Sequence, residues 1–329
     1  MASSIETTST TTTLKNNGNT YMSVDTNDDV AITNTLTATS PTFVTPNIGA
    51  ATVTSLNGGP LAGFRNRVIN GMFDVWQRGT SFSSSSVNEY SADRWRTEGY
   101  SQSTSVVRGT FGNTESLGGD FASYYARVTT NAAIPSGQYW AFQQRIETPQ
   151  VLRGGETVTL SYWARAVSGT IEAGRFTSSL GANPALTTTW QKITGSYTVS
   201  ASSTSYSLYL MYLGAGKAAT AVDFANVQLE VGTVATPFER RPYGTELALC
   251  QRYYETGYSR MRVDPFSFGA LGTSMSYAAT KRVEPTVAGT AVLGTISGTL
   301  SATVSHIFIN FSAGSSGNVS ATWTATAEL

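Results

Sequence analysis

The chain has 329 residues with 21 basic and 21 acidic side chains, and charged residues make up only 13% of it. A neutral chain of this kind does not attract nucleic acid through bulk charge, so we expect no nucleic-acid partner. Because Cys250 and His306 are the only residues of their types, the composition excludes a disulfide scaffold, a zinc site built from Cys and His, and a Cys/His nucleophilic pair. The segment Met1–Lys15 lacks a basic region followed by an apolar core, and no stretch approaches the roughly 18 apolar residues that cross a bilayer, so we expect neither a secretory signal nor membrane insertion.

Residues 1–62 are low in complexity and poor in large apolar side chains, with a run of Thr and Ser at Thr7–Thr13. Ordering a segment of this length costs on the order of 60 to 120 kcal/mol, whereas burial of its few large apolar residues returns only about 20 to 40 kcal/mol. Short strand-like pieces occur at 21–24, 29–33 and 51–54. We therefore predict a β stalk whose strands pair with identical copies in an intertwined homotrimer, with a disordered linker as the alternative.

Residues 63–243 show the alternation of apolar and polar side chains that is typical of β-strands. The segments 157–164 and 205–212 both alternate in this way, and Gly-rich or Ser-rich turns separate such segments. These spacings predict an antiparallel β-sandwich.

Residues 244–329 begin with the one persuasive helical pattern, from Thr245 to about Glu255. We expect Thr245 to cap this helix, Gly257 to stop it, and Cys250 to be a buried small apolar residue on its apolar stripe. The alternation that follows predicts a small C-terminal β-domain with strands over 266–275, 286–296, 299–311 and 319–329.

A specific series of segments runs through the chain from about residue 65: Val68–Thr80, Ala92–Trp95, Ala225–Gly232, Thr236–Pro242, Glu246–Glu255, Arg282–Thr286 and Ala327–Leu329. This series resembles bacteriophage tail fibre proteins, with the last two segments similar to their C-terminal β-domain. The central part, which includes Val158–Ala164, is also similar to jelly-roll carbohydrate-binding modules. The resemblance therefore implies a jelly-roll sandwich in residues 63–243.

The resemblance further implies a function. A tail fibre is a non-enzymatic, homotrimeric virion structural protein, which here would dock on another virion protein through residues 1–60 and bind a host cell-surface polysaccharide. No cofactor is expected. Two alternatives stay open: a collar, head-fibre or decoration protein without a receptor, and a polysaccharide depolymerase using paired acids such as Glu89, Asp93 and Glu98, although no spacing favours any pair.

Sugar recognition needs an aromatic face for the C–H groups and polar side chains for the hydroxyls. The candidate ligand-binding residues in or beside turn-rich stretches are Tyr100, Tyr139, Trp140 and Trp190. Structural packing is the alternative role for each of them. The resemblance to carbohydrate-binding modules also implies a structural calcium ion held by Asp74 and Asp223, with solvated surface acids as the alternative.

Two further features have structural interpretations. The run Arg240–Pro242 lies where the sandwich passes into the helix, near Glu239 and Glu246, so we expect a salt-bridged hinge in preference to a site for an anionic sugar. His306 lies in an apolar strand pattern and has no nucleophile elbow to serve, so we expect it to be packed or at an interface.

Overall fold

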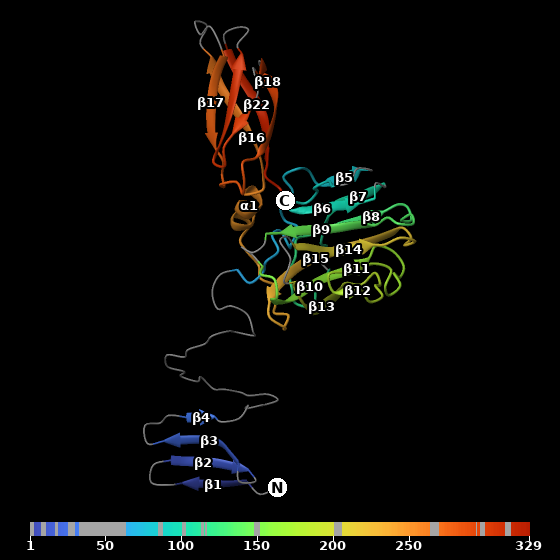
Figure 1. Ribbon diagram of the computed structural model, residues 1–329, viewed down its shortest axis with the longest axis vertical. Helices are drawn as coiled ribbons and strands as arrows, with labels where there is room; N and C mark the ends of the chain where they lie inside the picture. The colour runs from blue at the N-terminus through green and yellow to red at the C-terminus, as the bar shows by residue number, and fades with distance from the viewer. Residues whose placement is uncertain are drawn as a thin grey trace. The chain divides into compact units, whose positions relative to one another are not determined.

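The computed structural model describes residues 3–7, 11–16, 19–25 and 30–32, and then residues 64–329 except 85–87, 101–102, 113–114, 116, 148–151, 201–205, 264–269, 294, 297–299 and 313–316. The chain divides into two compact units, Met1–Thr52 and Val53–Leu329. The described elements are antiparallel β-strands and a single α-helix, which confirms the all-β prediction (Figure 1). No helix in these residues is long and apolar enough to span a membrane.

The first unit contains a four-stranded antiparallel sheet in the order β1-β2-β3-β4. Its strands are β1 (Ser3–Thr7), β2 (Thr11–Asn16), β3 (Asn19–Asp25) and β4 (Val30–Ile32). The pieces predicted at 21–24 and 29–33 correspond to β3 and β4, while the piece at 51–54 lies outside the described residues. Within the chain each of these strands pairs with its neighbour. Pairing with identical copies in a trimeric stalk stays a prediction.

Two antiparallel sheets form the sandwich of the second unit. The six-stranded sheet has the order β13-β10-β15-β8-β7-β5, and the five-stranded sheet has the order β12-β11-β14-β9-β6 (Figure 1). Their strands are β5 (Ser81–Ser84), β6 (Trp95–Gly99), β7 (Thr104–Thr110), β8 (Tyr124–Thr130), β9 (Trp140–Ile146), β10 (Thr157–Ala166), β11 (Thr177–Ser178), β12 (Gly181–Ala182), β13 (Gln191–Thr198), β14 (Tyr206–Leu213) and β15 (Thr220–Val231).

The inner faces of both sheets supply one continuous apolar core. The alternation predicted for β10 is confirmed, because Leu160 and Tyr162 are fully buried and point into this core. The alternation predicted for β14 holds only as far as Leu210. A register shift between Tyr209 and Met211 turns Met211 inward as well, so the outward positions change phase there.

Helix α1 spans Tyr243–Gln251, so it begins and ends earlier than predicted. Pro242 precedes the first turn with a φ of −56°, and no side chain caps the helix, which corrects the expected cap at Thr245. The helix stops before Gly257 because Tyr254 already starts the next strand. Cys250 is buried as predicted.

The predicted hinge salt bridges are present at the start of this helix. The guanidinium of Arg241 lies 3.0 Å from the Glu246 carboxylate and 3.8 Å from that of Glu239. Its Nη2 also donates to the backbone carbonyl of Val68 at 3.1 Å. The joint between sandwich and helix is therefore held by a nearly buried arginine.

The C-terminal β-domain has two small sheets, β16-β22-β18 and β17-β21-β19, with β20 also paired to β21. Figure 1 labels β16, β17, β18 and β22 of this domain. The strands are β16 (Tyr254–Val263), β17 (Ala270–Ser276), β18 (Thr286–Leu293), β19 (Thr295–Ile296), β20 (Ser301–Ala302), β21 (His306–Ser312) and β22 (Gly317–Thr326). Their core includes Ile309, Phe311 and Trp323. His306 is half-buried on β21 and contacts Ser276 Oγ at 3.2 Å.

Candidate functional site

The outer face of the five-stranded sheet carries an aromatic and polar surface. Side chains on β9 alternate, and because Phe142 points into the core, Ala141 and Gln143 point outward. Directly paired residues share a face, so Glu98 and Tyr212, which both pair with Ala141, also point outward. We call this surface the tyrosine face and define it by Glu98, Tyr139, Gln143, Arg145, Tyr209 and Tyr212.

The three tyrosine rings of this face contact one another. The rings of Tyr139 and Tyr212 stack with centroids 5.4 Å apart and an interplanar angle of 13°. The ring of Tyr209 meets that of Tyr212 edge-on at 5.7 Å and 79°. All three side chains are half-buried. Rings held in this way lose little conformational entropy when a ligand packs on them.

Glu98 organises the polar part of the tyrosine face. Its carboxylate accepts a hydrogen bond from the Tyr139 hydroxyl at 3.2 Å, one from Arg145 Nη2 at 3.1 Å and one from Gln143 Nε2, and it lies 3.3 Å from Arg96 Nη2. Burial and the neighbouring Glu98 charge raise the pKa of Tyr139, so its hydroxyl stays protonated. The network fixes the tyrosine ring without a ligand.

Gln143 lies on this face but is covered by its neighbours. Its side chain is fully buried, and its Oε1 accepts no hydrogen bond within the described residues. A buried amide oxygen without a donor is an uncommon feature of folded proteins. The groups of the tyrosine face that a ligand can reach are therefore the half-buried rings, the Glu98 carboxylate and the Arg145 guanidinium, which together can bind a sugar.

The structure separates the four predicted ligand-binding residues. Tyr139 belongs to the tyrosine face, and half-buried Tyr100 is its neighbour through a hydrogen bond from Tyr100 N to Tyr139 O at 2.6 Å. Trp140 is only 1% exposed and points into the sandwich core, so its ring is covered. Trp190 lies in a separate cluster associated with the six-stranded sheet, stacked on Phe111.

The two predicted calcium ligands have different environments. Asp223 is fully buried on β15, where Arg127 donates to both of its oxygens at 2.8 and 3.0 Å and Arg165 Nε donates at 2.9 Å. It is therefore an ion-paired residue and not a solvated acid. Asp74 is half-buried, and its pKa is raised to about 6, mainly by burial. The described residues contain no group of three or more His, Cys, Asp or Glu side chains arranged to hold a metal ion.

The sequence did not indicate Tyr209 and Tyr212 as site residues, and it indicated Glu98 only as one of several acids of the depolymerase alternative. Tyr212 was placed on the same side of its strand as Leu208, which is a core residue. The register shift in β14 reverses that assignment, and the sequence carries no Gly or Pro at that position to signal it.

No protein-family model and no curated protein sequence matches the chain. Among solved structures, the enzymatically active domain of tailspike protein 4 from bacteriophage CBA120 is similar at 16% identity and a TM-score of 0.31, over 51% of this chain and 22% of that chain. A carbohydrate-binding module of family 4 is similar at 21% identity and a TM-score of 0.27, over 50% of this chain and 98% of that chain. The CBM22-1 xylan-binding domain of Xyn10C from Paenibacillus barcinonensis is similar at 16% identity and a TM-score of 0.29, over 47% of this chain and 94% of that chain.

Proposed function

We propose that this chain is a bacteriophage tail fibre, a non-enzymatic virion protein that attaches the particle to a host-surface polysaccharide through the tyrosine face. The observation that carries the proposal is the set of three contacting tyrosine rings beside the Glu98 network. The rings suit the C–H faces of successive sugars, and the Glu98 carboxylate suits their hydroxyls. The resemblance of the sequence motifs to phage tail fibres supports the virion assignment.

The proposal includes a homotrimer whose residues 1–60 bind another virion protein. A flat surface on the outside of a sheet binds each sugar weakly, because it buries little of the ligand. Three copies in a fibre, and several fibres on a particle, raise the effective affinity by about two to four orders of magnitude. Weak single sites are therefore compatible with firm attachment.

Two acids of the sandwich, Glu98 and Glu147, favour attachment over hydrolysis. A glycosidase needs one carboxyl group that gives up its proton and a second that stays ionised, about 5 to 10 Å apart. Glu98 is instead bound by Arg145 and Tyr139, and Glu147 accepts from the Tyr253 hydroxyl at 2.9 Å and from Arg252 Nη2 at 3.3 Å. Carboxylates engaged in this way serve as acceptors.

Binding of the full-length protein to immobilised host cell-wall polysaccharide tests the proposed function. Tyr139→Ala and Tyr212→Ala should each weaken binding about tenfold, because loss of one aromatic contact costs roughly 1 to 1.5 kcal/mol. Tyr258→Ala is the matched control, since Tyr258 is 54% exposed on the C-terminal β-domain. Binding that is equally strong in all three variants, or absent at every polysaccharide density, would contradict the proposal.

Two more measurements test the absence of enzymatic activity and the homotrimer. Incubation with the polysaccharide should release no new reducing ends, and their appearance would identify a depolymerase. Sedimentation equilibrium should give the mass of three chains of 34.9 kDa each. A mass of one chain would contradict the homotrimer. Normal adsorption of a particle that lacks this protein would favour a collar or decoration role.

A further inference from the structure

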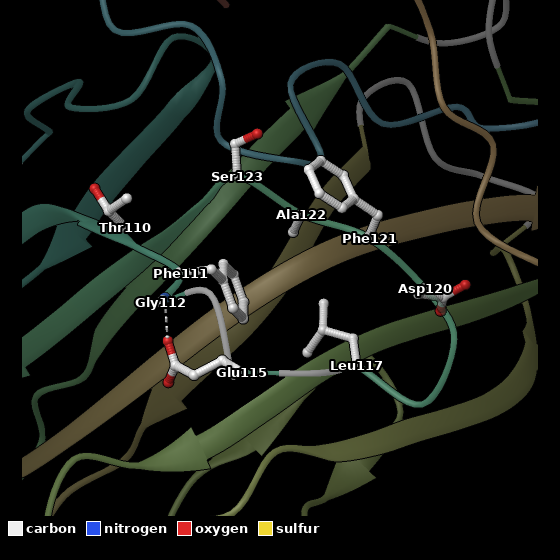
Figure 2. A pocket seen from close by; sticks show the side chains of 9 residues that line it. All are labelled: Thr110, Phe111, Gly112, Glu115, Leu117, Asp120, Phe121, Ala122 and Ser123. Atoms are coloured by element: carbon white, nitrogen blue, oxygen red, sulfur yellow. Dashed lines mark hydrogen bonds between the residues drawn. The ribbon is translucent and has the colours of Figure 1, made fainter.

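A pocket lies in the connection between β7 and β8, beside the outer face of the six-stranded sheet and thus on the other sheet from the tyrosine face. Its volume is about 560 Å³. Figure 2 shows the lining residues, which come from the end of β7 and from described parts of the connection, with the Gly112–Glu115 hydrogen bond dashed. The lining residues that matter for the argument are Phe111, Glu115, Leu117, Asp120 and Phe121.

Two phenylalanines supply aromatic walls. The ring of Phe111 is held from behind, because it stacks on Trp190 with centroids 5.0 Å apart and meets Tyr125 edge-on at 5.3 Å. Phe121 is 57% exposed, and the Arg240 guanidinium lies 4.5 Å from its ring centroid. The exposed part of the Phe121 ring is apolar surface that a ligand can cover.

Two carboxylates supply hydrogen-bond acceptors. Glu115 accepts from the backbone N–H of Gly112 at 2.9 Å and from Arg165, and these contacts outweigh burial and lower its pKa. Asp120 accepts from Trp163 Nε1 at 3.0 Å and lies 3.6 Å from Lys192 Nζ. The basic partners stand outside the lining, so the two acid charges are balanced while the lining itself contains no basic side chain.

The backbone keeps the pocket open without a ligand. The connection is closed at its base by a hydrogen bond from Phe111 N to Ser123 O at 3.1 Å, and Asp120 N donates to Leu117 O at 3.0 Å. Gly118, with a φ of +58°, lies so close to Trp163 that a Cβ there would stand 3.0 Å from the ring. Only glycine fits this turn without strain, so the turn is fixed against the sheet.

We infer that this pocket is a second carbohydrate subsite, which takes a single neutral sugar residue. Its volume lies within the roughly 300 to 1,000 Å³ of small-molecule sites. Phe111 and Phe121 meet the apolar faces of the sugar, while Glu115 and Asp120 accept from its hydroxyls. An anionic sugar is disfavoured because the two charged side chains of the lining are both acidic, and a cationic ligand because Arg165 and Lys192 already balance their charge. The class of ligand, a sugar, rests on the proposed function, whereas the location of the site rests on the pocket itself.

The consequence is two-point binding by each chain. The tyrosine face suits a run of sugars along a polymer, whereas the pocket suits one residue at a branch or a chain end. Because the two sites lie on different sheets, a single chain would engage two separate glycan segments, which raises the effective affinity when both are filled.

Saturation-transfer NMR of the full-length protein with glucose, galactose, mannose and N-acetylglucosamine as probes tests the inference. At least one of these sugars should bind the wild type. Phe121→Ala should weaken that binding about tenfold, and Glu115→Gln should weaken it while retaining the shape of the side chain. The control Val234→Ala, at a residue 53% exposed after β15, should leave it unchanged.

The outcomes separate the two proposals. Polysaccharide binding without any monosaccharide signal, or a signal that survives both pocket variants, overturns the pocket and leaves the tyrosine face intact. The tyrosine face is overturned, and the pocket is retained, if two results occur together. The pocket variants remove the monosaccharide signal, and Tyr139→Ala leaves polysaccharide binding unchanged. If neither ligand binds, both are overturned.

Discussion

The carboxyl group of Asp74 gives the most direct test of how burial sets the stability of this chain. It lies between two core residues, Phe73 and Val75, and its Oδ1 is buried without a hydrogen bond in the described part of the chain. Burial raises its pKa to about 6, Arg240 and Arg108 oppose the rise, and Glu246 adds to it. The acid is therefore partly desolvated without a partner that compensates it.

The sign and size of the effect follow from that shift. The folded chain holds a proton on Asp74 between pH 3.8 and about 6, whereas the unfolded chain releases it. Stability therefore falls as the pH rises through this window and stays lower above it. A shift of about two units corresponds to roughly 3 kcal/mol, and the partial exposure of the carboxyl group reduces the expected effect to about 1 to 2 kcal/mol.

Urea denaturation at a series of pH values from about 3.5 to about 8 measures how the free energy of unfolding changes with pH. This range brackets the raised pKa of about 6. Asp74→Asn should be about 1 to 2 kcal/mol more stable than the wild type at pH 8 and equal to it at the acid end. Glu172→Gln, at an exposed acid, is the control and should follow the wild type. Identical pH profiles for Asp74→Asn and the wild type would refute the reasoning.

Adding calcium in the same assay tests whether Asp74 is a metal ligand or a buried acid without a partner. A bound Ca²⁺ would stabilise the wild type at pH 8 and would do so less in Asp74→Asn, and chelation would reverse it. We expect neither addition nor chelation to move the curve. Stabilisation by calcium that depends on Asp74 would show that the carboxylate has a partner after all.

Three further predictions concern the C-terminal half. Gly257→Ala should destabilise the protein by about 2 to 3 kcal/mol in thermal or urea unfolding, because the new Cβ would stand 2.2 Å from the Trp323 ring. The Cys250 thiol should react with a thiol reagent only on unfolding, because burial raises its pKa well above the ordinary value. Lys281→Ala should cost about 3 kcal/mol because it leaves the carboxylate of Glu255 buried without its partner, and the double variant Lys281→Met, Glu255→Leu should recover most of that loss.

The alternation of apolar and polar residues within a single strand was predictable, because successive side chains of a strand point to opposite faces of the sheet. In β10 each side chain alternates between core and outer face, and Leu160 and Tyr162 are buried as expected. Strand β16 was missed because Tyr254 and Glu255 fit a helical pattern equally well. Their pairing with β22, some seventy positions later in the chain, decides the conformation. Tertiary pairing of this kind leaves no signal in the segment itself.

The candidate site was predictable only in part. Tyr139 was found because an aromatic residue beside a turn often lies at the surface. Trp140, its neighbour, points the opposite way by the same alternation, and only the register of β9 against β6 shows which of the two is covered. The place of Glu98 in the tyrosine face could not be recognised, because its partners Arg145 and Gln143 are brought to it by strand pairing.

The same pairing limits where a polymer would lie on the tyrosine face. Arg96 and Arg145 each contact Glu98, and each also lies 3.4 Å from the backbone oxygen of Leu329, which accepts from the Tyr90 hydroxyl at 3.0 Å. The guanidinium end of the face is thus already occupied by the segment that follows β22. Most of its donors are engaged within the chain and the unpaired amide oxygen of Gln143 is buried, so the contacts left for a sugar are the tyrosine rings. Affinity should therefore depend more on the rings than on the arginines.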